Sequence, residues 1–247
     1  MSAIVWSVRR YGEVDSTNTV ALELARGGCP EGTVVTAESQ SRGRGRMGRS
    51  WFSPVGTGLY LSAVLRPGIS ADILPPLTLV AGVASAEAAE RVAGIPVRLK
   101  WPNDLRCGEK KVGGILAELE REDGPCVVLG VGLNVNTAPA AFPPELSGEA
   151  TSLRAAAGRV VNRESLLQAL LECLDRWYGR LQAEGFGPVR ERWRQLSQTL
   201  GRRVRVALPG GGRVEGLAED IDERGRLVVR APGGERVAVD AGDVMEV

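Results

Sequence analysis

Residues 97–102 (VRLKWP), 112–120 (VGGILAELE) and 126–136 (CVVLGVGLNVN) decide the fold, because they are three strand-like runs in close succession. Their density of Val, Leu and Ile is typical of strands that occupy central positions in a sheet. Helical patterns precede and follow them along the chain. The sequence therefore predicts a mixed β-sheet with flanking helices, which makes this part of the chain an α+β domain.

Further strands and helices are expected on both sides of this core. The strands are recognised by short apolar runs, and the helices by apolar residues at a spacing of three and four together with capping residues. A helix that begins at Asp15, Ser16 or Thr17 runs to about Arg26, where two glycines end it. Additional strands are predicted at 4–8, 33–40 and 58–67, and additional helices at 77–93, 166–181 and 189–196, with a loose Ala- and Pro-rich passage over 137–158.

The texture of the chain changes at about Leu200. Four short β runs follow, at 202–208, 213–220, 226–231 and 235–244, and they are separated by PGGG, DERG and PGG turns. Their number and length fit a small SH3-like barrel. The predicted domains are residues 1–198, a large α+β domain, and residues 199–247, the small SH3-like domain.

Residues 41–51 (SRGRGRMGRSW) carry four arginines and three glycines within eleven positions. Glycine lets the backbone approach a ligand closely, and the arginine fork matches carboxylate and phosphate groups. The segment is therefore interpreted as an anion-binding loop. The alternatives are a solvated linker and a nucleic-acid-binding tail. The formal net charge of only +1 weakens the nucleic-acid alternative.

The composition excludes several kinds of chemistry. The chain of 247 residues has no histidine, which removes the commonest general base and zinc ligand. The four cysteines are widely spaced without a CxxC pair, so we expect free thiols and no metal site. No signal peptide and no long apolar run is present, and the expected location is the cytoplasm without membrane association.

The three lysines of the chain, Lys100, Lys110 and Lys111, lie within twelve residues of one another. Lys100 leads into Pro102, Asn103 and Asp104, which place polar side chains at a strand end, where a turn cap is the alternative role for the aspartate. Lys111 precedes Gly113 and Gly114 inside a strand. These glycines predict either a β-bulge or a flat small molecule that lies on bare backbone.

Residues 130–136 (GVGLNVN) do not form a phosphate loop, since the GxxxxGK[ST] and GxGxxG spacings are both missing. Asn134 and Asn136 alternate with valine, so both amides lie on one face of a strand. Either the two amides end the strand or they contact a nucleotide.

Six motifs together resemble the biotin protein ligase family, the biotin–[acetyl-CoA-carboxylase] ligases. They run in the family's order and cover most of the first 140 residues. They are DSTN at 15–18, ESQSRGRGRMGRSWFSP at 38–54, GLYLS at 58–62, KWPNDL at 100–105, KVGGILAE at 111–118 and GVGLNVN at 130–136.

The resemblance implies a two-step reaction and a catalytic domain similar to class II synthetases and lipoate ligases. Biotin and ATP, with Mg²⁺ expected alongside ATP, give biotinyl-5′-adenylate, and a lysine of the biotin carboxyl carrier protein then takes the biotin. Lys111, Arg46 and Asp104 are the implied catalytic residues, with Asp104 steering or deprotonating the amine. The implied biotin contacts are Ser16, Thr17, Asn18, Gln40, Arg44, Gly45, Arg46, Lys111, Gly113 and Gly114, and the implied nucleotide contacts are Arg46, Arg49, Trp51, Asn103, Lys111 and Asn134.

Three expectations concern behaviour beyond the chemistry. The loop at 42–49 is expected to fold over the adenylate, with Arg46 as its functional cation and Arg42 as a surface residue. Trp51 either stacks on adenine or anchors the loop. Some family members carry an N-terminal DNA-binding domain, but DSTN begins at residue 15, so neither repressor activity nor DNA binding is expected, while a homodimer through the central sheet is left open.

Two other functions compete with this interpretation. A lipoate ligase or octanoyl transferase of the same superfamily would have a different glycine and lysine pattern. An RNA-binding module could combine the Arg-Gly loop with the C-terminal barrel, but near-neutral charge and an aromatic content of 4% argue against it.

Overall fold

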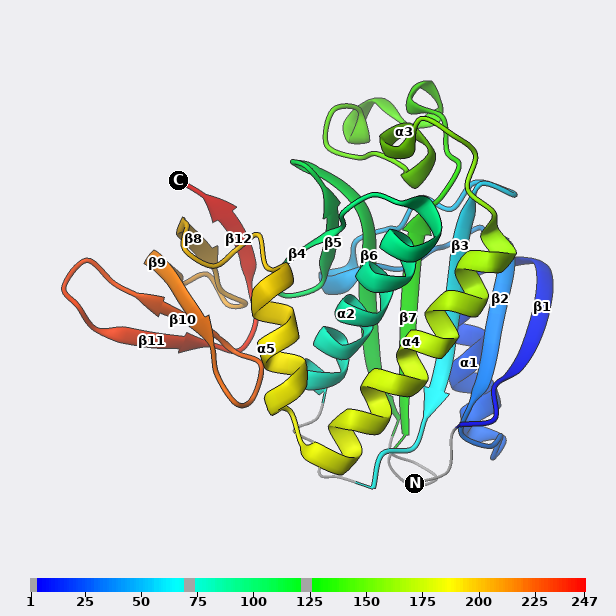
Figure 1. The fold of residues 1–247 in the computed structure, drawn as a ribbon, viewed down its shortest axis with the longest axis horizontal. Helices are drawn as coiled ribbons and strands as arrows, with labels where there is room; N and C mark the ends of the chain where they lie inside the picture. Colours follow the sequence, from blue (N-terminus) through cyan, green and yellow to red (C-terminus); the bar gives the residue numbers. More distant parts are fainter. Residues whose placement is uncertain (1–3, 69–73, 121–125) are drawn as a thin grey trace.

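The computed structural model of the chain describes residues 4–68, 74–120 and 126–247. Its main element is a seven-stranded sheet in the order β1-β2-β3-β7-β6-β5-β4 (Figure 1). β1 and β2 are parallel, and the other neighbouring strands are antiparallel. The strands are β1 Ser7–Val14, β2 Thr33–Gln40, β3 Gly58–Leu65, β4 Arg98–Lys100, β5 Asp104–Cys107, β6 Lys110–Glu120 and β7 Cys126–Asn134.

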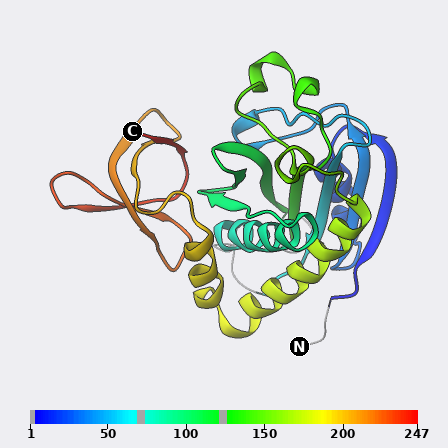
Figure 2. The same cartoon turned by 45° about the horizontal axis from the view of Figure 1, so that its top comes forward.

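Helices cover both faces of this sheet. The long helices α2 and α4 lie together on one face, and α1 lies on the opposite face (Figures 1 and 2). Short 3-10 turns occur in the Arg-Gly loop and in the passage before α3. The helices are α1 Thr17–Arg26, α2 Leu74–Ala93, α3 Leu153–Ala157, α4 Arg163–Glu184 and α5 Gly187–Leu196, and the 3-10 turns are η1 Arg46–Gly48, η3 Pro139–Ala141 and η4 Pro144–Leu146.

Two apolar cores result from the alternation of side chains along the strands. On β2, Val34 belongs to the core under α2 and α4, whereas Val35 belongs to the core under α1. On β7, Val127 and Val128 divide between the same two cores. Since successive residues of a strand face opposite sides, the strand position of a residue determines whether it faces α2 or α1.

The C-terminal part is a five-stranded antiparallel sheet in the order β11-β10-β9-β8-β12. It is consistent with the predicted SH3-like fold, but the sheet is not closed, because β11 and β12 both lie at its edges. The predicted strand at 235–244 is in fact two strands separated by a turn. The strands are β8 Arg203–Ala207, β9 Arg213–Ile221, β10 Leu227–Arg230, β11 Arg236–Val239 and β12 Asp243–Glu246.

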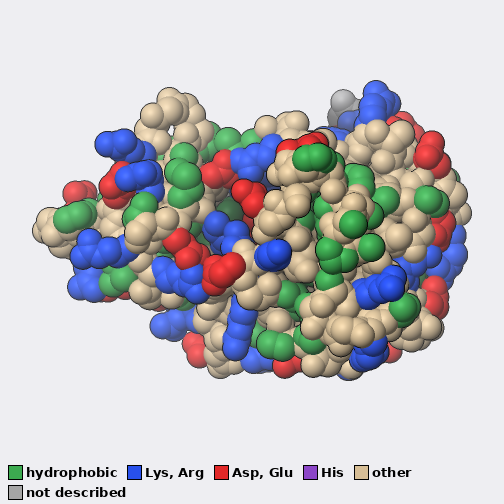
Figure 3. Space-filling model, turned by 90° about the horizontal axis from the view of Figure 1, so that it is seen from above, with side chains coloured by type: hydrophobic (Ala, Val, Ile, Leu, Met, Phe, Trp, Pro, Cys, Tyr) green, Lys and Arg blue, Asp and Glu red, His purple; other side chains and the backbone are tan. Residues whose placement is uncertain are grey.

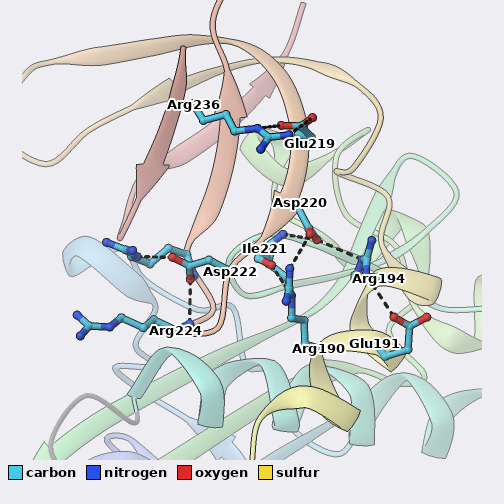
Figure 4. A network of polar contacts seen from close by, with 10 residues as sticks. Arg190, Glu191, Arg194, Glu219, Asp220, Ile221, Asp222, Arg224 and Arg236 are labelled. Carbon is cyan, nitrogen blue, oxygen red and sulfur yellow. Dashed lines mark hydrogen bonds and ion pairs between the residues drawn. The ribbon is translucent and has the colours of Figure 1, made fainter. Parts of the chain in front are cut away.

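Polar contacts fasten the C-terminal sheet to the rest of the chain. Arg190 and Arg194 of α5 both pair with Asp220 of β9, at 2.6 and 3.2 Å (Figure 4). A second contact links the two parts of the chain, because the buried indole of Trp101 donates a hydrogen bond of 3.0 Å to the carbonyl of Gly225. The turn before β5 is therefore held by the C-terminal sheet.

The predicted α+β architecture is confirmed, with corrections to individual elements. The passage at 137–158, which was expected to be loose, contains the short helix α3. The first strand covers Ser7–Val14 and not 4–8, because it is a polar edge strand with no apolar run to mark it. β5 had not been predicted, since its four residues are too few to show a pattern. The four cysteines are free thiols, as predicted. In the described ranges, every helix is too short or too polar to cross a membrane.

Candidate active site

A cavity of about 710 Å³ lies on the α1 face of the large sheet, within the usual range of roughly 300–1,000 Å³ for small-molecule sites. The N-terminus of α1, the Arg-Gly loop, the turn between β4 and β5, and strand β12 line it. Its floor consists of β3, β6 and β7. At Gly114, Gly130 and Gly132 these strands place bare backbone under the cavity.

The floor glycines are required by the protein's own side chains. A Cβ atom at Gly130 would lie 2.2 Å from Oδ1 of Asn18, and one at Gly132 would lie 2.6 Å from Nε1 of Trp51. Real Cβ atoms do not approach other atoms so closely. The flat group that rests on the sheet is therefore the indole of Trp51, which packs over Gly114 and Gly132.

The predicted β-bulge is also present beside the paired glycines. The register of β5 against β6 shifts between Leu105 and Arg106, which pair with Gly113 and Lys111 respectively. Gly113 and Gly114 face opposite sides of the sheet. A Cβ atom added at Gly113 would point toward Leu105 and Leu133 in the core under α2. Gly114 lines the cavity, whereas Gly113 lies outside its lining.

The four arginines of the loop each reach a different part of the protein. Their partners lie on the N-terminal side of α1, on β6, in the β4–β5 turn and on β12, so the loop is tied at four points. The pairs are Arg42 with Asp15, Arg44 with Glu118, Arg46 with Asn103, and Arg49 with Asp243.

Arg46 is the least exposed of the four loop arginines and lines the cavity. Its guanidinium donates a hydrogen bond of 3.1 Å to Oδ1 of Asn103. Burial lowers the pKa of this guanidinium from its ordinary value, and the carboxylates of Asp243 and Asp104 oppose that shift. Arginine remains charged over the physiological range, so Arg46 is a partly desolvated cation. Arg42 is a surface residue as expected, since its side chain is 79% exposed.

Lys111 and Asp104 form an ion pair within the same cavity, with 2.5 Å between Nζ and Oδ1. Both side chains are partly buried. The ammonium also lies 5.5 Å from the centre of the Trp51 ring, which is within the range of a cation–π contact. Nε1 of Trp51 is buried without a hydrogen-bond partner among the described residues. The indole therefore lies on the cavity floor with an open donor.

A group of neutral polar side chains occupies the other end of the cavity. Ser16 takes the N-cap position of α1 without a side-chain capping bond, so capping does not explain this residue. The backbone N–H of Thr17 donates to Oε1 of Gln40 at 2.8 Å, and Nε2 of Gln40 donates to Oγ of Ser53 at 2.8 Å. Thr17 and Asn18 are almost completely buried.

The two asparagines at and just beyond the end of β7 have clear structural partners. Nδ2 of Asn134 donates to the carbonyl of Thr151, and Asn136 exchanges two hydrogen bonds with the backbone of Val161. Both amides thus fasten the passage that follows the strand. Asn134 nevertheless also lines the cavity.

Three residues that contribute to the cavity region were missed by the sequence interpretation. Ser62 lies in the middle of an apolar strand, and Glu118 lies in the apolar run ILAELE. A polar residue in a buried strand is a sequence signal that could have identified both of them. Asp243 lines the cavity from β12 and had no local signal.

The charges around the site have both signs. The view in Figure 3 shows basic and acidic side chains interspersed between the large domain and the C-terminal strands. Such a face differs from the continuous basic surface that nucleic-acid binding requires. Of the residues with described positions, no three or more Cys, Asp or Glu side chains form a cluster that could hold a metal ion.

Comparison with known proteins identifies relatives of the chain. A profile of the Biotin/lipoate A/B protein ligase family matches residues 11–134, and the Biotin protein ligase C terminal domain matches residues 199–245. The chain is 40% identical over 223 residues to the bifunctional ligase/repressor BirA of Bacillus subtilis, covering 90% of this chain and 68% of that protein. It is 38% identical over 239 residues to the biotin–[acetyl-CoA-carboxylase] ligase of Mycobacterium tuberculosis, covering 94% and 86%.

A solved structure has a similar fold along almost the whole chain. It is the biotin protein ligase of Aquifex aeolicus in complex with biotin and ATP. The TM-score is 0.87 at 30% sequence identity, and the match covers 98% of this chain and 99% of the other.

Proposed function

The chain belongs to the biotin protein ligase family, and we propose that its cavity carries out the family's reaction with the residues described above. The enzyme forms biotinyl-5′-adenylate and pyrophosphate from biotin and ATP. It then transfers biotin to a lysine of a biotin carboxyl carrier protein. The named biotin ligases among its relatives and the Aquifex complex with both substrates support this activity.

One observation supports the assignment of the reacting groups above all others. Arg46 and Lys111 lie with other cationic side chains at one end of a single cavity, and the residues at its other end, such as Thr17 and Asn18, are neutral and buried. An acid with a neutral polar head and a carboxylate tail fits this polarity. In our proposal the head lies near Ser16, Thr17, Asn18 and Gln40, and the carboxylate lies near Arg44, Gly45, Arg46 and Lys111.

In the first step, a biotin carboxylate oxygen attacks the α-phosphorus of ATP, and pyrophosphate leaves. The two reactants are anions and repel each other as they approach. Arg46 and Lys111 would neutralise the charge that concentrates between carboxylate and phosphate in the transition state. Lys111 has a flexible stem and a protein partner at 2.5 Å, so we propose that it exchanges Asp104 for the substrate anions.

In the second step, the amine of the carrier lysine attacks the acyl carbon of the adenylate, and AMP leaves. The amine must lose a proton, and the chain has no histidine to accept it. Asp104 is a carboxylate at the edge of the same cavity, beside Lys111. When Lys111 turns to the adenylate, Asp104 is free to orient or deprotonate the amine.

We assign the nucleotide to the region around Arg49, Trp51, Asn103 and Asn134, all of which line the cavity. The ring of Trp51 offers a flat surface on the cavity floor. Mg²⁺ commonly binds through one or two carboxylates together with substrate phosphates. The residues fit that mode, because single carboxylates such as Asp104 and Asp243 line the cavity. Bound there, the ion would neutralise phosphate charge.

The division of the chain and its location complete the proposal. We assign catalysis to residues 1–198 and treat residues 199–247 as the second domain, which matches the family's C-terminal domain. The four free cysteines support a reducing compartment such as the cytoplasm. Neither DNA nor a membrane is a partner in this proposal, and the carrier protein is.

Transfer to a carrier tests the proposed function. The chain is incubated with biotin, ATP and a biotin carboxyl carrier domain, and attached biotin is detected with streptavidin. A carrier whose acceptor lysine is replaced by arginine is the matched control. Labelling of the lysine-containing carrier alone is expected, and lipoate attachment without biotin attachment would overturn the proposal.

A further inference from the structure

A chain of hydrogen bonds, buried at its Thr17 end and exposed at its Arg44 end, connects the neutral end of the cavity to the Arg-Gly loop. It runs from Thr17 to Ser62, Asn18, Glu118 and finally Arg44. Thr17, Asn18 and Ser62 are at most 4% exposed. Glu118 lies on β6 and Ser62 lies on β3. Both therefore belong to the strands of the cavity floor and not to the Arg-Gly loop or α1.

The orientation of the Asn18 amide follows from its partners. One end of the amide faces Oε2 of Glu118 at 2.8 Å and the carbonyl of Leu116 at 3.3 Å. A carboxylate and a carbonyl only accept hydrogen bonds, so this end must be the NH₂ group. The opposite end, Oδ1, is therefore an acceptor, and it faces Oγ of Ser62 at 2.5 Å.

This orientation determines where the hydroxyl hydrogens point. Ser62 has one hydroxyl hydrogen, and Oδ1 of Asn18 engages it. Thr17 can then donate its own hydrogen to Oγ of Ser62 at 2.8 Å or to Oε1 of Gln40 at 3.2 Å. Within the described part of the chain, Ser62 is the group placed to donate a hydrogen bond to Oγ1 of Thr17. The single hydroxyl hydrogen of Ser62 is already engaged by Asn18, so it is not available to Thr17.

We infer that Glu118 is a positioning residue that sets the donor and acceptor polarity of the head subsite, through Asn18 and Ser62. It leaves Thr17 as a buried acceptor that requires a hydrogen-bond donor from the ligand. The inference rests on the proposed function, which supplies a ligand whose cyclic urea has two N–H groups. An acid whose head lacks an N–H at this point leaves Oγ1 of Thr17 unpaired, and a buried unpaired acceptor is costly.

The substitution Glu118→Gln changes this polarity with little change of shape. Arg44 favours the oxygen of the new amide, so the NH₂ group turns toward Asn18. The Asn18 amide then rotates: it accepts from the new amide, gives up its longer contact of 3.3 Å with the Leu116 carbonyl, and donates to Ser62, which frees the hydrogen of Ser62 for Thr17. Thr17 is now satisfied by the protein, and its requirement for a ligand N–H disappears.

The experiment compares biotin with its two cyclic carbamate analogues, in each of which one ring N–H is replaced by oxygen. The measured quantity is kcat/KM for acid-dependent pyrophosphate exchange. For the wild type we expect one carbamate to be poorer than biotin by about tenfold or more. In Glu118→Gln this preference falls to within about threefold, and the ratio for the other carbamate stays unchanged.

Two further variants separate polarity from general damage. Glu118→Asp keeps a carboxylate and should retain the preference for biotin. In the double variant Glu118→Gln/Ser62→Ala the preference should return, because the link to Thr17 is cut and nothing donates to its hydroxyl. Glu120→Gln is the matched control, since Glu120 is on the same face of β6 and pairs with Arg26. Thermal unfolding confirms that each variant is folded.

The outcomes distinguish this inference from the proposed function. A folded Glu118→Gln that keeps the wild-type preference would overturn the inference, and so would a wild type that uses both carbamates as well as biotin. The second measurement needs no variant and is therefore independent of folding. A wild type that shows no exchange with biotin would instead contradict the proposed function.

Discussion

The two ends of the cavity are built in opposite ways. At the charged end, Arg46 and Lys111 each have a protein partner that a substrate anion can replace, and their side chains are only partly buried. At the neutral end, Thr17 and Asn18 are almost completely buried in a continuous hydrogen-bonded network. Thr17 and Asn18 cannot rearrange there without losing hydrogen bonds.

This difference indicates a division of roles between the two ends. Exchangeable polar contacts can follow the charge as it moves from carboxylate to mixed anhydride, at small cost in reorganisation. A closed network of neutral groups discriminates between acids, because a wrong ligand leaves a buried group unpaired. Substitutions at the charged end should therefore reduce the rate, whereas those at the neutral end should weaken the binding of biotin.

The largest expected effect is that of Lys111→Ala. Loss of this cation should lower the rate of adenylate formation on the order of 1,000-fold, with little change in unfolding temperature. Lys110→Ala is the matched control, because Lys110 is the exposed neighbour on the same strand. Biotin-dependent pyrophosphate exchange measures the rate. Full activity of the Lys111 variant would remove its assigned role.

Arg46→Ala should lower the same rate by about 100-fold, less than Lys111→Ala because the neighbouring loop arginines partly replace its charge. Arg42→Ala serves as the comparison, since this loop arginine lies on the surface. Its exchange rate should stay within about twofold of the wild type. Equal losses in the two variants would mean that the loop acts through its total charge and not through Arg46.

Gly130→Ala probes the neutral end. The added Cβ would lie 2.2 Å from Oδ1 of Asn18, so the network must shift, and we expect a loss of about 2 kcal/mol in unfolding free energy. The KM for biotin should rise more than kcat falls. Gly12→Ala on β1 is the control, because no atom lies within 4 Å of its added Cβ. A fall in kcat alone would contradict the division of roles.

The Arg-Gly loop should change its contacts when substrates bind. In the structure its arginines pair with protein groups, and the substrates offer stronger anionic partners. Limited proteolysis should therefore cut residues 42–49 several times more slowly with biotin and ATP than without them. An unchanged cleavage rate would count against loop closure.

The smallest expected effect is a pH dependence of ATP binding through Lys100, which also lines the cavity. Burial lowers the pKa of this ammonium below 10.5, with a further contribution from Arg106. Bound phosphates should raise the pKa of Lys100 again. At an alkaline pH between its pKa without ATP and its pKa with ATP, binding of ATP therefore takes up a proton. Affinity for ATP should fall as pH rises through the lowered pKa, as calorimetry can measure. Lys100→Arg should abolish this dependence.

The sequence predicted most of the fold because the central strands and long helices carry strong apolar patterns. It missed β5 and misplaced β1, since the first is too short and the second is too polar to show such a pattern. In the candidate site, the motifs supplied the residues of α1, the loop and β6. They did not separate Gly113 from Gly114, because that distinction depends on the strand register.

Other parts of the site depend on distances along the chain that no local pattern reveals. Asp243 reaches the cavity from β12, nearly two hundred residues after Arg49, with which it pairs. The role of Ser62 becomes visible only when β3 lies beside α1, so that its hydroxyl meets Asn18. Tertiary packing alone produces both contacts.

Pyrophosphate exchange into ATP with different acids tests the central claim most directly, since it requires the neutral end to select the acid and the charged end to activate it. Labelled pyrophosphate should enter ATP when biotin is present, and lipoate should not replace biotin. Exchange with lipoate, or with neither acid, would contradict the account.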